Sequence, residues 1–548
     1  MIPRAGLTLL LAQAGPKAVA HPPPPMPNYL VLEWMAAITG LLFIFAFGAI
    51  VGSFLNVVVY RVPKGLGLVS PPSSCPSCET RLTWRENFPI LGWLALGGRC
   101  RFCRSKISPE YPLIETLTAV LFAAIFFLWF MQSMVPPSSV GPLWQSWQPE
   151  WARAGLVYMW PMLAMVFCLV ASLIAITLID ARTFTIPLSI PWVATLVGFI
   201  GHPLHALALT LLPGAGRAVS HLHSASSGQP WTIPTPTGGW LAASIGGAVG
   251  IGLSSLLVAL GVMPRSFADY DEWEAKHTQP AEPASPRDGQ SATSIQPDEP
   301  KSPHIKEILV RTFCLVTPAV ALMFAGALLG ASLYDAPLPG LSLGMMVGLV
   351  IGFILRNLVA RSARGDQGPI WLEYPHARRE MLWELLFLAP CLMLAWLGYW
   401  LATPHGPPGG VHVGVFEGWF QEPALWLRAL GGSLLGYLVG GGIVWGLRLL
   451  GTLGMGQEAM GLGDVHLMAA VGAVLGWVDP AAAFIIAPAS GLSWTIGVWA
   501  FRRWHRGTQG PALPYGPHLA AATVVVILLH PLLVRWLADL PGGGIAVP

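Results

Sequence analysis

Twelve long apolar segments recur along the chain, and they constrain its fold more than any other feature. A helix needs about 20 mostly apolar residues to cross a bilayer. We predict spanning helices, with loose ends, over 36–60, 113–130, 157–180, 187–212, 238–263, 310–332, 340–357, 381–402, 424–447, 465–478, 480–500 and 518–538. Only 10% of the residues are charged, too few to cover a soluble protein of 548 residues, and a net charge of +3 gives no reason to expect a nucleic-acid partner. The sequence predicts an all-α polytopic membrane protein.

Basic residues in the loops indicate the orientation of these helices. The loop 61–112 carries eight Arg and Lys residues, which places it in the cytoplasm by the positive-inside rule. Alternation then puts the N-terminal segment 1–35 outside. It puts the loops 181–186, 264–309, 358–380, 448–464 and 501–517 inside, where most of the remaining Arg and Lys residues lie. Arg153 is the only Arg or Lys residue in the predicted outer loops 131–156, 333–339 and 403–423. This agreement favours an even number of spans.

The predicted organisation follows from these spans and loops. Its parts are the extracytoplasmic segment 1–35, a first span 36–60, the cytoplasmic loop 61–112, a helical region 113–212, a region 213–423 and a helical region 424–548. The loop 264–309 holds 14 charged residues and seven prolines with almost no apolar periodicity, which predicts a disordered cytoplasmic loop. We see no internal repeat, and the sequence indicates no oligomeric state.

Two cysteine pairs in the loop 61–112 form the strongest metal signature. Cys75 and Cys78 are separated from Cys100 and Cys103 by 21 residues, so two short turns each present two thiols. Four thiolates complete a tetrahedral zinc site with no open position, which indicates a structural metal. Two disulfides or four free thiols are the alternatives, and a reducing cytoplasm disfavours disulfides.

Two aspartates lie at the ends of predicted spans. Asp180 ends the third span, and an ionisable group at membrane depth is a functional candidate, although it could also face water or pair with Arg182. Asp464 stands in the sequence Gly461-Leu-Gly463-Asp464, before a short apolar segment. The two glycines allow a close approach and unusual dihedral angles beside the carboxylate, whereas the simpler interpretation is an N-cap.

The two aspartates are more informative as a pair. Both fall on the predicted cytoplasmic face, and two carboxylates that share one site retain a proton between them at neutral pH. The ionised Asp deprotonates a water and the protonated Asp donates to a carbonyl oxygen, which is the chemistry of aspartic peptide hydrolysis.

Other ionisable residues have simpler interpretations. Glu115 and Glu458 lie near helix ends, where they could face water. His202 and His205 lie on a weak predicted span and do not predict a second metal site.

Several blocks occur in an order that resembles the prepilin peptidases, membrane aspartic peptidases of the Gly-x-Gly-Asp class. The blocks are 52–63, the cysteine loop, 107–115, 178–187, 461–467 and 513–520. The resemblance covers about 36–212 and 424–538 and implies eight spans, so that 213–423 would be an insertion with four more. It implies that Asp180 and Asp464 form the catalytic dyad and that Gly461 and Gly463 shape the loop of the second aspartate.

The resemblance also implies a substrate class and a location. Members remove a basic leader from type IV prepilins or type II secretion pseudopilins at the cytoplasmic face of the bacterial inner membrane. Many also methylate the new N-terminus with S-adenosylmethionine, and the cysteine loop is associated with those members. Members usually have Lys where His466 stands and often an acidic residue where Leu188 stands. Neither difference removes a carboxylate of the pair.

Three alternatives remain open from the sequence. Another Gly-x-Gly-Asp protease, of the presenilin or signal peptide peptidase kind, would typically have Tyr before the first aspartate, where Ile179 stands. A proton-coupled transporter would predict inverted repeats and helices interrupted at the midplane. An inactive scaffold is the third alternative, although both aspartates are present.

Overall fold

The described part of the chain is helical. The computed structural model describes residues 28–70, 72–135, 147–211, 232–268, 376–403, 423–456, 458–505 and 514–538. Within these residues there is no β-strand, only two isolated bridges, Ser74 with Arg81 and Arg99 with Lys106, both in the cysteine loop. The predicted all-α fold is therefore confirmed for the described residues.

Ten of the twelve predicted spans coincide with helices. These are α1 (Asn28–Arg61), α3 (Glu110–Phe126), α6 (Leu156–Thr183), α7 (Ser189–Leu211), α9 (Gly238–Ala259), α13 (Ala377–Ala402), α15 (Leu425–Met455), α16 (Leu462–Leu475), α17 (Val478–His505) and α18 (Gly516–Ala538). In the described ranges, nine helical segments are long and apolar enough to cross a membrane, and α16 is shorter. The chain is thus a multi-pass membrane protein. The predicted spans 310–332 and 340–357, and the loop 264–309 after residue 268, lie outside the described residues.

Two predicted boundaries differ more from the helices than the others do. The first span begins at Asn28 rather than at 36, because residues 28–35 continue the apolar helical sequence. The seventh described span, α15, continues to Met455, so that residues 448–455 are helix rather than loop. The charged Arg448, which we counted among the loop charges, therefore lies inside a helix.

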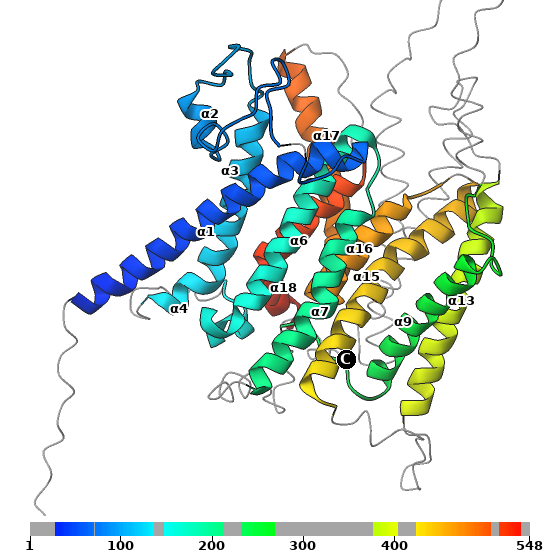
Figure 1. Ribbon diagram of the computed structural model, residues 1–548. Helices are drawn as coiled ribbons and strands as arrows, with labels where there is room; N and C mark the ends of the chain where they lie inside the picture. Colours follow the sequence, from blue (N-terminus) through cyan, green and yellow to red (C-terminus); the bar gives the residue numbers. More distant parts are fainter. Residues whose placement is uncertain are drawn as a thin grey trace, which may run out of the picture.

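The helices form one bundle with a pair of helices at each edge (Figure 1). Helices α6, α7, α15, α16 and α18 contact one another in the middle, α1 packs on α3 at one edge, and α9 packs on α13 beside α15 at the other. The Cys-rich loop with its short helix α2 (Leu91–Ala95) follows the C-terminal end of α1 and precedes α3.

Small residues bring the helix axes close together. A Cβ built on Gly436 of α15 would lie 2.0 Å from the carbonyl oxygen of Gly472 on α16. A Cβ on Gly52 of α1 would lie 2.6 Å from Cα of Glu115 on α3. Close backbone contact through small residues is a main source of helix association in membranes, so these glycines fix which helices pair.

Candidate functional site

The cysteine loop folds as two turns of the same construction. In the first, Cys75 N–H donates to Thr80 O at 3.0 Å and Glu79 N–H donates to Cys75 O at 2.8 Å. In the second, Cys100 N–H donates to Ser105 O at 2.9 Å and Arg104 N–H donates to Cys100 O at 3.0 Å. Glu79 and Arg104, each one residue after the second cysteine of its turn, both adopt positive φ. The repeated geometry directs all four sulfurs to one point.

The four sulfurs fit a tetrahedral metal ion. The Sγ atoms of Cys75, Cys78, Cys100 and Cys103 all lie within 4.8 Å of one another, and those of Cys75 and Cys103 are 3.8 Å apart. A zinc ion with Zn–S bonds of about 2.3 Å would hold tetrahedral sulfurs roughly 3.8 Å apart. No disulfide joins any of the described cysteines. The loop can therefore bind a metal ion.

Backbone amides prepare this loop for a cation. The N–H groups of Ser77 and Cys78 donate to the sulfur of Cys75 and lower its pKa from 9.0 to about 6. The hydroxyl of Ser105 lowers the pKa of Cys103 in the same way. Thiolates are the form that coordinates metal, so these two lowered pKa values favour binding at neutral pH, whereas desolvation and the neighbouring thiols of Cys75 and Cys103 raise the pKa of Cys100.

A buried glutamate fastens the cysteine loop to the helical bundle. Glu115 of α3 is 7% exposed, and its Oε2 accepts the backbone N–H of Ile90 at 2.7 Å. The expectation that Glu115 faces water was wrong, because the loop covers the start of α3. Trp93 adds a bond from its indole N–H to Ile107 O at 3.2 Å.

The structure brings Asp180 and Asp464 to the same point. Asp180 lies in the last turn of α6 and is 4% exposed, and Asp464 lies in the first turn of α16 and is 8% exposed. A Cβ built on Gly516, at the start of α18, would lie 2.4 Å from Oδ2 of Asp180 and 3.3 Å from Oδ1 of Asp464. The sum of these distances is an upper limit for the separation of the two oxygens, so the carboxylates are neighbours.

The geometry disagrees with the simpler interpretation of each aspartate. Arg182 pairs with Glu110 at 3.0 Å, near the surface, and not with Asp180. The N-cap of α16 is Gly461, so Asp464 is not a cap. Its Oδ1 is buried and accepts no hydrogen bond from any described residue. An unpartnered buried carboxylate oxygen is costly and is typical of functional sites.

Of the two glycines of the second motif, Gly463 acts through close approach, whereas a Cβ on Gly461 would meet its nearest atom at 3.6 Å, an ordinary contact. A Cβ on Gly463 would lie 2.7 Å from Cβ of Ile186, in the loop after α6, so only glycine lets the two segments meet. Gly461 has φ of −69°, which any residue can adopt, so the expected unusual dihedral angles are absent at this position. His466 is half-buried, with its ring 6.2 Å from that of Trp192.

Gly516 was missed as a site residue by the sequence analysis. It lies within the block 513–520, which carried the resemblance without a stated role. The available signal was a glycine just before the predicted span 518–538, in a chain with two aspartates at the ends of predicted spans. His202 and His205 do not join the site. Their Nε2 atoms bond to Val474 O at 2.9 Å and Tyr158 O at 2.8 Å.

Taken together, these features define a multi-pass helical membrane protein with a four-cysteine loop and a buried aspartate pair. The chain matches a family model described as the bacterial peptidase A24 N-terminal domain over residues 46–129. It is 55% identical over 82 residues to a prepilin leader peptidase/N-methyltransferase of Myxococcus xanthus, which covers 15% of this chain and 24% of that protein.

Two further relatives carry the same name. The chain is 45% identical over 92 residues to the protein of Klebsiella pneumoniae, covering 16% of this chain and 40% of the relative. It is 31% identical over 200 residues to that of Neisseria gonorrhoeae, covering 30% of this chain and 59% of the relative. The matches thus span between a quarter and three fifths of these relatives' lengths. No solved structure matches the chain. The stretch that matches the family model contains the cysteine loop and Glu115.

Proposed function

We propose that this chain is a membrane aspartic endopeptidase that removes the basic leader from type IV prepilins or type II secretion pseudopilins. The observation that carries the proposal is the meeting of Asp180 and Asp464 around Gly516. Two adjacent buried carboxylates share a proton, so one deprotonates the attacking water and the other donates to the scissile carbonyl oxygen. The similarity to proteins named prepilin leader peptidases supports this substrate class.

The position of the pair favours a peptidase that acts at one membrane face. Both aspartates lie within terminal turns of their helices, at the end of the bundle where α1 runs into the basic cysteine loop. By the positive-inside rule this end is cytoplasmic, and the bacterial inner membrane is the membrane we propose. A basic leader would stay in the cytoplasm while the apolar pilin helix lies in the bilayer. A transporter would instead need its carboxylates near the midplane.

The cysteine loop has a structural role in this proposal, with zinc as the metal. Four cysteine ligands leave no open coordination position, so the ion would stabilise the two turns rather than activate water. The name N-methyltransferase in the relatives supports a second activity, methylation of the new N-terminus with S-adenosylmethionine.

Mass spectrometry of a co-expressed substrate tests the proposal. A pilin-like substrate with a basic leader would be expressed with the wild-type protein, with Asp180→Asn and with Asp464→Asn, and its N-terminus would be determined. We expect leader removal by the wild type only, with a net mass gain of one CH2 unit where a methyl group replaces a hydrogen of the new N-terminus. Cleavage that survives both substitutions would exclude the aspartic mechanism. Asp479→Asn, at an Asp that pairs with His530 outside the dyad, is the control for a general loss of fold.

A further inference from the structure

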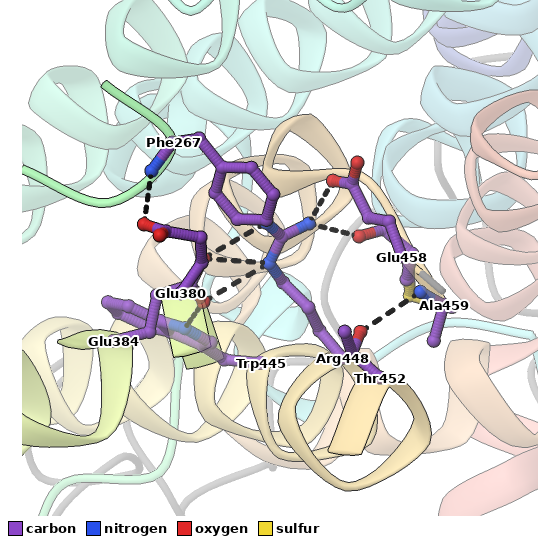
Figure 2. Close-up of polar contacts among 9 residues, drawn as sticks. Phe267, Glu380, Glu384, Trp445, Arg448, Thr452, Glu458 and Ala459 are labelled. Atoms are coloured by element: carbon purple, nitrogen blue, oxygen red, sulfur yellow. Dashed lines mark hydrogen bonds and ion pairs between the residues drawn. The ribbon is translucent and has the colours of Figure 1, made fainter. Parts of the chain in front are cut away.

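A fully paired arginine lies inside the bundle next to the loop that carries Asp464. Arg448 of α15 is 2% exposed, and a buried charge in a membrane protein is costly unless it is paired. Its Nε and Nη2 donate to Glu384, and its Nη1 donates to the carboxylate of Glu458 and the carbonyl oxygen of Met460 (Figure 2). The guanidinium therefore joins two parts of the chain that lie on opposite sides of it.

One side of this arginine is bound by residues from the region 213–423. Glu384 of α13 is 3% exposed and accepts from Nε of Arg448 at 3.1 Å, from Nη2 at 3.0 Å and from the indole N–H of Trp445 at 2.7 Å. The ring of Phe267, which follows α9, lies 5.3 Å from the guanidinium carbon. The N–H of Phe267 donates to Glu380 at 2.8 Å (Figure 2).

The other side is the segment that leads into the second aspartate motif. The segment Glu458-Ala459-Met460 directly precedes Gly461, the first residue of the motif that ends at Asp464. The hydroxyl of Thr452, one helical turn after Arg448, accepts the N–H of Ala459 at 3.0 Å (Figure 2). Hydrogen bonds thus connect Glu384 of α13, through Arg448, to Glu458 and to the carbonyl oxygen of Met460. Met460 is the residue before Gly461, the N-cap of α16.

We propose that α13 sets the position of the Asp464 loop through Glu384 and Arg448, and that Arg448 is a positioning residue of the site. Glu384 accepts hydrogen bonds from Nε and Nη2 of the guanidinium, and this orients Nη1 toward the carbonyl oxygen of Met460. Without Glu384 the arginine would keep only its partly exposed partner Glu458, and the carbonyl of Met460 would lose a fixed donor. This gives the region 213–423, expected to be an insertion, a role in the geometry of the site. The effect on catalysis rests on the proposed peptidase function, whereas the effect on the loop does not.

Hydrogen–deuterium exchange of the purified full-length protein in detergent tests the positioning directly, without substrate. We expect amide exchange across residues 458–464 to increase about tenfold in Glu384→Gln, because loss of a charge-assisted hydrogen bond shifts local opening by about this factor. Glu115→Gln is the matched control. Glu115 is another buried glutamate, 7% exposed, but it lies on α3 and accepts the backbone N–H of Ile90 in the cysteine loop. This control should leave exchange in 458–464 unchanged.

A double variant separates positioning from stability. Glu384→Leu with Arg448→Met replaces the buried ion pair by apolar side chains, a change that often maintains or raises stability. We expect a bundle with wild-type thermal stability whose 458–464 amides still exchange about tenfold faster, because methionine donates nothing to Met460 O. In the leader-cleavage assay, kcat should fall by about 10- to 100-fold with KM unchanged in both Glu384→Gln and the double variant.

The outcomes distinguish the two proposals. Wild-type exchange across 458–464 in Glu384→Gln, or in the double variant, would overturn the positioning role whatever the cleavage result. Faster exchange in a protein whose wild type cleaves no prepilin would support the coupling of α13 to the loop and reject the peptidase function.

Discussion

Gly516→Ala is the substitution that most sharply probes the meeting of the two aspartates. The new Cβ would lie 2.4 Å from Oδ2 of Asp180 and 3.3 Å from Oδ1 of Asp464. Ordinary contact needs about 3.5 Å, so the carboxylate of Asp180 must move by about 1 Å. Gly516 begins α18 without a positive φ, and alanine favours helix, so the backbone should accept the change.

The expected effect is large on activity and small on stability. A displacement of about 1 Å in a catalytic group can lower the rate by about 100-fold, and we expect a fall of that size in kcat. The displaced atom is the end of a short side chain that can rotate, so the free energy of unfolding should change by less than about 1 kcal/mol. Leader cleavage would be measured by mass spectrometry and thermal stability by tryptophan fluorescence.

Gly497→Ala is the control for this substitution. Gly497 lies in α17, and a Cβ built there meets no atom within 4 Å. It should keep full activity. If Gly516→Ala cleaves at the wild-type rate while the Asp→Asn variants are inactive, the carboxylates do not meet at Gly516 in the working enzyme.

Three other predictions concern the metal and the packing of the bundle. Cys75→Ser should abolish stoichiometric zinc in elemental analysis, whereas Cys168→Ser, within α6, should retain it; equal zinc in both would reject the four-cysteine site. Zinc binds thiolates, so protons compete with it for the four sulfurs, including that of Cys75 with its pKa of about 6. Zinc affinity should therefore fall as the pH is lowered from about 7 to about 5, and an affinity that does not change with pH would contradict this ligand set. Gly436→Ala should destabilise the bundle by about 1–3 kcal/mol in thermal unfolding, because its Cβ would lie 2.0 Å from Gly472 O. Gly442→Ala is the control, because a Cβ there meets no atom within 4 Å, and it should leave the stability unchanged. Equal stability of the two variants would refute the close contact of α15 and α16.

The features that the sequence predicted well are those set by local chemistry. Apolar length alone predicted the helices in the described residues, and even the weak segment 187–212 is the helix α7. The spacing of the cysteine pairs predicted the gathering of four sulfurs, because each turn is short and self-contained. An even number of spans between Asp180 and Asp464 predicted that both lie at the same end of the bundle.

The features that the sequence did not predict depend on how helices far apart in the chain pack. Gly516 carries no side chain to signal its place between the carboxylates. Glu115 was interpreted as a charge that could face water and Arg448 fell in a predicted loop, but each is buried by a partner from elsewhere: Ile90 of the cysteine loop and Glu384 of α13. The sequence alone does not show which charged residues are buried, because burial depends on the segments that pack over them in the fold.

Whether the losses of cleavage activity in the two Asp→Asn variants add in the double variant tests the central claim most directly. Single-turnover leader cleavage would be measured for Asp180→Asn, Asp464→Asn and the double variant against wild type. If the two carboxylates form one catalytic unit, each single substitution should lose about as much activity as the double, because residues that act together are strongly non-additive. Two partial losses that add in the double variant would show that the aspartates act separately and would contradict the dyad.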